Sequence, residues 1–393
     1  MRIAVIGAGI IGSATAAELV GRGHDVTLFD PEPGNGASRA AAGMLAATAE
    51  TAWGQDDLLP LARESATLYP GFVASLEAAS GHDVGYGATG TLAAGVDAAD
   101  RAALFELAEL QSSHGMPVQC LTGSAARELE PALGPAVSSA VLADGDHRID
   151  PRRVTGALRD ILGERVRAER VGGVVRRDGR VIGIRLEAGE NVEADVVIAA
   201  AGLGVTDIDG LPALPLRPVW GDILRLRVPA ALRPLLTRTV RALVRGRAVY
   251  LVPRDDGTVV LGASVREGGV AGVQAGEVLA LLRDAEAVLP GISECEIVEM
   301  LARPRPGTPD ALPLLGRPEP GLVISAGYDR HGVLLAPWAA RLGADLAEGV
   351  PLDGATAAIL DPLRFPDAGN RPVAASEHLT PPAVAELAGV RKG

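Results

Sequence analysis

The apolar residues of the chain fall into short runs, and each run predicts one element. Residues 3–6 are all apolar and predict a short buried strand. A helix is expected over 10–20, ending near Gly21–Gly23, and a second strand over 26–29. The first thirty residues therefore read as strand, helix, strand, an order that is typical of an α/β fold.

Farther along the chain, helical and extended patterns alternate. Helices are expected at 57–80, 98–115, 149–162 and 275–290. Pro70 is expected to interrupt the first of these, and Pro151 to begin the third, because proline suits the first turn of a helix but not its interior. Short Val-rich strands with glycine turns are expected at 165–202, followed by antiparallel strands at 220–229 and 247–268. The last segment contains Asp256-Gly257, a strong hairpin signal.

These patterns divide the chain into two interleaved sets. The α/β segments are 1–84, 141–219 and 300–350, and the antiparallel segments are 85–140 and 220–299. The first set is typical of an α/β fold and the second of an antiparallel α+β fold. The Pro- and Ala-rich tail, 351–393, is expected to be loosely attached.

Composition removes several classes of function. The chain has 393 residues, 48% of them hydrophobic, but no apolar run near the roughly 20 residues of a membrane span. A net charge of −12 argues against nucleic acid or an anionic membrane as the main partner. Two cysteines and scattered histidines predict neither a disulfide framework nor a metal site. The single lysine, Lys392, excludes Schiff-base chemistry in the body of the protein. With no targeting segment before the first motif, a cytoplasmic location is expected.

A glycine fingerprint lies between the first strand and the first helix. Gly7, Gly9 and Gly12 form G-x-G-x-x-G. The first permits a tight turn, the second lets the backbone approach a pyrophosphate, and the third lets helix and strand pack closely. Asp30 ends the second strand, where a carboxylate accepts hydrogen bonds from a ribose. A glycine-rich turn without a ligand is the alternative; the flanking elements and the acid favour a dinucleotide.

Tiny residues then fill "GNGASRAAAGMLAA", 34–47, and let a backbone lie against a flat ligand. With this segment the sequence resembles the D-amino-acid oxidase family of flavoproteins, and within it the glycine oxidases. The resemblance covers about 350 residues. It implies an α/β protein in which the first set of segments forms a Rossmann-type domain that holds non-covalent FAD. The second set is then a discontinuous antiparallel α+β substrate domain. The fingerprint and the resemblance together predict these FAD contacts: Gly7, Gly9, Ile10, Ile11, Gly12, Asp30, Pro31, Ala37, Ser38, Ala42, Gly43, Met44, Val171, Gly202, Tyr328, Asp329, Arg330, His331, Gly332, Val333 and Leu334.

The stretch "LARPRPGTPD", 301–310, holds Arg303 and Arg305 on a backbone that the prolines keep extended. A guanidinium matches a carboxylate with two parallel hydrogen bonds. Residue for residue, Arg305-Pro306-Gly307-Thr308 matches the glycine oxidase motif whose arginine grips the substrate carboxylate. The alternative is a structural arginine that pairs with Asp310 or with backbone carbonyls.

Two further residues are candidates by resemblance. Tyr250 matches the family's active-site tyrosine and is expected to share the substrate carboxylate with Arg305; ordinary strand packing is the alternative. Arg330 matches an arginine of the "AG-x-x-R-x-G" loop, and its role among flavin, substrate and loop stays open. The helix that follows this loop is expected to direct its positive end at the flavin.

The expected reaction is oxidation of a small amino acid, glycine first and then sarcosine or small D-amino acids, with O2 as acceptor. The glycine oxidases imply a role in thiamine thiazole synthesis and a homotetramer. One alternative is a D-amino-acid dehydrogenase that uses another electron acceptor. Another is a non-catalytic nucleotide-binding module, which would leave "AAAGML" and "RPGT" unexplained.

Overall fold

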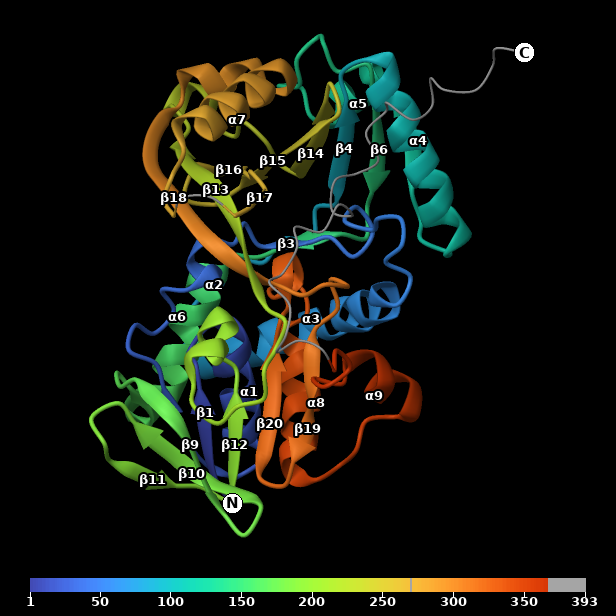
Figure 1. Ribbon diagram of the computed structural model, residues 1–393. Coiled ribbons are helices and arrows are strands. Elements are labelled where there is room, and N and C mark those ends of the chain that lie inside the picture. The colour runs from blue at the N-terminus through green and yellow to red at the C-terminus, as the bar shows by residue number, and fades with distance from the viewer. Residues whose placement is uncertain (269–270, 367–393) are drawn as a thin grey trace.

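The computed structural model describes residues 1–268 and 271–366, which form two parts stacked one above the other (Figure 1). The lower part is built on a six-stranded sheet with the order β19-β20-β12-β1-β2-β8. The bounds of its strands are β1 Arg2–Ile6, β2 Asp25–Phe29, β8 Val166–Arg167, β12 Val196–Ala199, β19 Leu314–Glu319 and β20 Leu322–Ala326. All neighbours in this sheet run parallel except β19 and β20. The predicted Rossmann-type α/β fold is confirmed.

The two faces of this sheet explain the unbroken apolar run in β1. Ile3 and Val5 pack with the helices, whereas Ala4 and Ile6 pack against a small sheet on the opposite face. The helices are α1 Ile10–Gly21, α3 Leu58–Ser80, α6 Pro151–Leu162 and α8 Ala336–Glu348; the small sheet contains β9 Val171–Arg177, β10 Arg180–Leu186 and β11 Asn191–Glu193. A strand buried on both faces has no polar side to alternate with.

The upper part is a nine-stranded sheet with helices α4 Ala98–Ser113, α5 Gly123–Leu129 and α7 Ala275–Val288 (Figure 1). Its order is β17-β13-β16-β15-β14-β4-β6-β5, with β18 also paired to β13. The bounds are β4 Thr91–Gly95, β5 Gln119–Thr122, β6 Ser139–Ala143, β13 Arg217–Arg227, β14 Thr239–Val244, β15 Arg247–Pro253, β16 Thr258–Gly262, β17 Arg266–Glu267 and β18 Glu296–Gly307. The hairpin predicted about Asp256-Gly257 is the antiparallel pair β15–β16.

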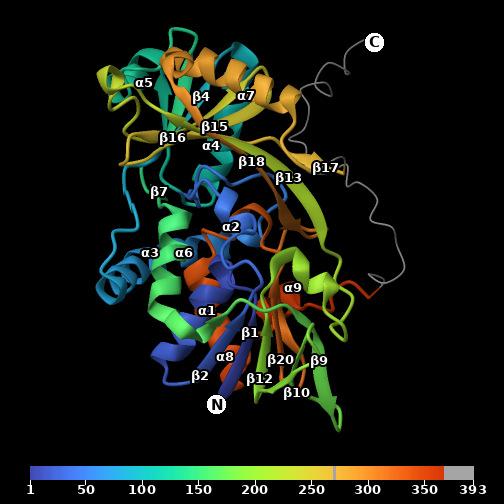
Figure 2. The ribbon, with the colours of Figure 1, turned by 90° about the vertical axis from the view of Figure 1, so that its left-hand side faces the viewer.

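Two long strands connect the upper and lower parts. β13 and β18 pair antiparallel from Arg217 opposite Gly307 to Arg227 opposite Glu296. They descend together from the upper sheet toward the lower part (Figures 1 and 2). The predicted boundaries at 219/220 and 299/300 fall inside these strands, so the domain limits stay a prediction. The expected extended conformation of "RPRPG" is present, since these residues form the end of β18.

Two expectations are wrong. α3 is not interrupted at Pro70, because it runs through from Leu58 to Ser80. Pro70 is exposed, so the carbonyl group that loses its N–H partner can reach water. The tail is not loose over residues 351–366: helix α9, Gly354–Leu360, buries Leu360 completely, and Arg364 forms an ion pair with Asp310 at 2.8 Å. The rest of the tail, 367–393, lies outside the described residues.

Within residues 1–268 and 271–366, none of the helices combines the length and the apolar character that crossing a membrane requires.

The docking of α9 can be measured. Leu360→Ala removes a fully buried side chain and is expected to lower the free energy of unfolding by about 2–5 kcal/mol. Leu363→Ala, on a side chain that is 48% exposed, is the matched control and is expected to change it by less than about 0.5 kcal/mol. Chemical denaturation measures both. Equal effects of the two variants would show that this segment is not docked.

Candidate active site

The glycine fingerprint forms a close turn between β1 and α1. Gly7 has φ +106°, a conformation that favours glycine. A methyl carbon on Gly12 would lie 2.0 Å from the carbonyl oxygen of Gly7, so only glycine fits there. The first turn of α1 follows, with amide groups that no earlier carbonyl can satisfy. This geometry is suited to a pyrophosphate at a helix N-terminus.

Asp30 fastens the same turn. One carboxylate oxygen accepts from the N–H of Ala8 at 2.8 Å, and the other accepts from the N–H of Glu32 at 2.9 Å. Nearby, the Ser38 hydroxyl accepts from the N–H of Ile10 at 3.0 Å. These contacts place Asp30 and Ser38 beside the fingerprint. The ribose role of Asp30 stays a prediction.

The "AAAGML" segment runs from the end of α2, Ala37–Ala40, into β3, Met44–Leu45, which lies below the upper sheet (Figure 1). At Gly43 a methyl carbon would lie 2.0 Å from the carbonyl oxygen of Ile149, and φ is +75°. Arg254, at the end of β15, donates to the carbonyls of Ala42 and Ile149. The segment is thus clamped from the upper part by a buried arginine that the sequence analysis missed.

The loop Tyr328–Leu334 lies between β20 and α8 and is tied to α3. Ser65 donates to the carbonyl of Leu334 at 2.6 Å, and Tyr69 donates to that of Val333. The Tyr328 hydroxyl bonds to that of Ser325 at 2.9 Å. Of the remaining predicted contacts, Val171 begins β9 and is buried, and Gly202 follows β12 with φ +59°.

Arg305 has an uncompensated charge. Its Nη1 points to the carbonyl oxygen of Ser264 at 3.5 Å, and no ion pair among the described residues includes it. Of the structural alternatives, pairing with Asp310 is wrong, because Asp310 pairs with Arg364, whereas a contact with a backbone carbonyl is present at Ser264. The remaining donors of Arg305 are suited to an anion that comes from outside the chain.

Tyr250 lies beside Arg305 at the junction of the two parts. Its ring packs with Ala42 and Met44 of the "AAAGML" segment, and its phenol is close to Gly262. Burial raises the pKa of Tyr250, and the positive charge of Arg305 acts against that rise. The phenol therefore stays protonated and is a hydrogen-bond donor at neutral pH. The structure thus brings Arg305, Tyr250 and the "AAAGML" segment together.

Arg330 turns toward the loop 50–55. Its Nη2 donates to the carbonyl oxygen of Glu50 at 3.2 Å and to Gln55 at 3.0 Å, and its Nε donates to Nε2 of His331 at 2.9 Å. Of the three roles left open for Arg330, these contacts support a structural one, since they join its own loop to residues 50–55. Its assignment as a catalytic residue stays a prediction.

Glu50 and Arg241 form a partly buried ion pair that sequence reasoning missed. The distance is 2.6 Å, and Arg241 lies opposite Tyr250 in the β14–β15 pair. Burial alone would raise the pKa of Glu50, but the charge of Arg241 holds it below its ordinary value. A signal was present, since Glu50 is the first charged residue after ten uncharged ones. Its partner lies 191 positions away, where no local pattern indicates it.

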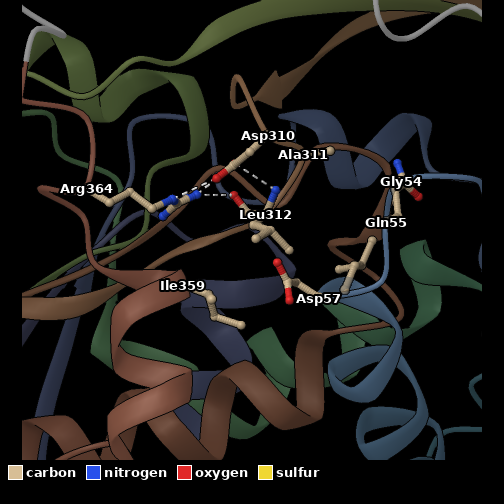
Figure 3. Close-up of a pocket in the computed structure, with 9 residues that line it drawn as sticks. Gly54, Gln55, Asp57, Asp310, Ala311, Leu312, Ile359 and Arg364 are labelled. Atoms are coloured by element: carbon tan, nitrogen blue, oxygen red, sulfur yellow. Dashed lines mark hydrogen bonds and ion pairs between the residues drawn. The ribbon is translucent and has the colours of Figure 1, made fainter.

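A cavity of about 300 Å³ opens beside the loop 50–55 (Figure 3). It is lined by Gly54, Gln55, Asp57, Leu58, Asp310, Ala311, Leu312, Ile359 and Arg364. The figure shows the Arg364–Asp310 pair along one wall and Asp57 along another. These are not the residues predicted to bind cofactor or substrate. We therefore build the candidate site on Arg305 and Tyr250.

Comparison with known proteins shows which family the chain belongs to. Residues 2–346 match the sequence profile of the FAD dependent oxidoreductase (DAO) family. The chain belongs to this family, and its cofactor is FAD. The small residues of the fingerprint and the helix N-terminus that follows them are consistent with that cofactor.

Individual relatives agree with the family. The chain is 33% identical to a glycine oxidase of Geobacillus kaustophilus over 88% of its own length and 92% of the relative's. It is 32% identical to a bifunctional protein ThiO/ThiG of Nostoc, spanning 88% of this chain but 52% of that protein. A crystal structure of glycine oxidase from Geobacillus kaustophilus superposes with a TM-score of 0.83 at 31% identity, over 92% of this chain and 98% of that one.

His331 generates a prediction on pH. Its Nδ1 is buried 3.9 Å from Glu50, and burial together with the charge of Arg330 lowers its pKa from 6.5 to about 3. In the unfolded chain the ordinary pKa returns, so between pH 6.5 and 3 only the unfolded state takes up the proton. The stability that neutral His331 contributes is present above pH 6.5 and is lost as the pH falls.

His331→Gln removes this dependence. We expect the wild type to lose about 1 kcal/mol more than the variant between pH 7 and pH 5.5. Denaturant unfolding at a series of pH values measures the difference. Parallel curves for the two proteins would show that His331 is not buried in its neutral form.

Proposed function

We propose that the protein oxidises a small amino acid to the imino acid and passes the electrons to O2, giving H2O2. Glycine is the first candidate substrate, followed by sarcosine and small D-amino acids. The observation that carries the proposal is the guanidinium of Arg305, which has no ion-pair partner among the described residues, beside the partly buried phenol of Tyr250 and the "AAAGML" segment. The glycine oxidases among its relatives support the substrate class.

In this proposal, Arg305 and Tyr250 bind the carboxylate. The guanidinium supplies charge and two N–H donors, and the phenol adds a third donor. Fixing the carboxylate at two groups orients the amine and the Cα–H bond, and orientation accounts for much of the rate enhancement in such reactions. No side chain is required as a strong base, provided that the amine enters neutral.

The cofactor would be held by the predicted FAD residues around Gly7, Asp30, Gly43 and the loop Tyr328–Leu334. When bound, FAD supplies hydride acceptance. The protein's own residues hold the substrate and exclude water. Arg254 supports the cofactor segment from the upper part, and Glu50, Arg241 and Arg330 hold the loop 50–55 in place.

Two further points complete the proposal. The similarity to a bifunctional ThiO/ThiG protein supports a role in thiamine thiazole synthesis, with the imino acid as the product consumed. We also propose a homo-oligomer, a homotetramer by resemblance to the glycine oxidases. Membership in an oxidoreductase family argues against a non-catalytic nucleotide-binding module.

A peroxide assay tests the substrate class. The FAD-loaded protein in air is expected to form H2O2 with glycine, and at lower or comparable rates with sarcosine and D-alanine. Flavin reduction by these amines without peroxide would favour the dehydrogenase alternative. No reduction of the flavin by any of them would contradict the proposal.

Arg305→Ala tests the acid clamp. Loss of a charge-assisted contact worth about 1.5–3 kcal/mol predicts a rise in KM of about 10- to 150-fold for every acid tested. Arg227→Ala is the matched control, because Arg227 lies on β13, is 58% exposed and pairs only at the surface with Glu296. Steady-state kinetics on both variants decide the matter: equal KM values for Arg305→Ala and Arg227→Ala would remove Arg305 from the site.

A further inference from the structure

Gly221 lies directly against the guanidinium of Arg305. A methyl carbon built on Gly221 would be 2.5 Å from Nη2, 2.8 Å from Cζ and 2.9 Å from Nη1 of Arg305. Three nearly equal distances mean that the methyl group would meet the face of the guanidinium and not its edge. The plane of the Arg305 guanidinium therefore lies against the backbone of β13 at Gly221, where no side chain is present.

The pairing of β13 with β18 explains this contact. Arg305 is opposite Val219, and Gly221 is two residues farther along β13, on the same face of the sheet. Diagonal neighbours of this kind are within reach of long side chains. Any side chain at position 221 would project into the space that the guanidinium occupies.

A second support begins at the next residue. Asp222 is fully buried, its N–H donates to the Ser264 hydroxyl at 2.8 Å, and that hydroxyl donates to the Asp222 carboxylate. Ser264 is thus fixed, and its carbonyl oxygen faces Nη1 of Arg305. One face and one nitrogen of the guanidinium are supported, which leaves other donors for a ligand.

We infer that Gly221 is a positioning residue. Because Gly221 has no side chain, the guanidinium of Arg305 can lie against the backbone of β13 in the orientation that binds a substrate carboxylate. This inference rests on the proposed function, in which Arg305 binds that carboxylate. The positioning role of Gly221 requires only that small carboxylate anions bind through Arg305.

The chemistry of the contact makes the inference testable without loss of the fold. In Gly221→Ala the three atoms nearest the methyl group would all belong to the end of the flexible Arg305 side chain. The strand is therefore expected to keep its place while the guanidinium moves. Acid binding, and not stability, is the quantity that should change.

The experiment measures binding of acetate, a carboxylate without an amine to oxidise, through the visible spectrum of the FAD-loaded protein. Gly221→Ala is expected to raise the Kd for acetate at least about tenfold, with an unchanged melting temperature. KM for the oxidised amino acid should rise more than kcat falls. Gly276→Ala on α7 is the control, because a methyl group there would meet open space. It should leave the Kd for acetate and the KM for the amino acid unchanged.

A double-mutant cycle separates positioning from general damage. In the Arg305→Ala background, Gly221→Ala is expected to change the Kd for acetate by less than about twofold, because the atoms that the methyl group meets are gone. An equal penalty in both backgrounds, or an unchanged Kd in the single variant, would overturn the inference. If Gly221→Ala alone fails to fold, the double variant should fold; failure of both would also overturn it.

The same cycle distinguishes the two proposals. Acetate binding that depends on Arg305 and Gly221, in a protein that oxidises no amine, would support the positioning role of Gly221 and reject the proposed function. Acetate binding that does not depend on Arg305 would reject both.

Discussion

The pairing of β13 with β18 is the constraint on which the candidate site depends. These strands run from the upper sheet toward the lower part (Figure 1), and Arg305 lies near the end of β18, opposite Val219. Pro304 and Pro306 keep the end of β18 extended, and β13 supplies the paired backbone on which the arginine side chain lies. A cation held by two strands keeps its position without a carboxylate partner from the chain.

Three other arginines, in contrast, have partners within the chain. Glu50 neutralises Arg241 at 2.6 Å, and Asp310 neutralises Arg364. Arg254 uses its donors on backbone carbonyls that hold the cofactor segment. Arg305 is partly buried and has no ion-pair partner among the described residues, and a charge that is removed from water is costly unless it is paired. A small acid is a ligand that its chemistry fits.

Local patterns predicted the parts of the molecule whose physics is local. Gly7, Gly12 and Asp30 lie in one short segment, and their spacing carries its own structural reason. The extended "RPRPG" stretch follows from proline sterics alone. Glu50, Arg241 and Arg254 could not be found in this way, because their contacts join residues far apart in the chain. Pro70 and the start of the tail were misjudged for a related reason: exposure of the proline and docking of Leu360 are set by packing.

The central claim is that Arg305 and Tyr250 together bind a carboxylate beside the cofactor. A crystal structure of the FAD-loaded protein with acetate tests it most directly. The account predicts the acetate oxygens within hydrogen-bonding distance of the Arg305 guanidinium and the Tyr250 hydroxyl. Acetate bound elsewhere, with Arg305 paired to a carboxylate of the protein, would contradict it.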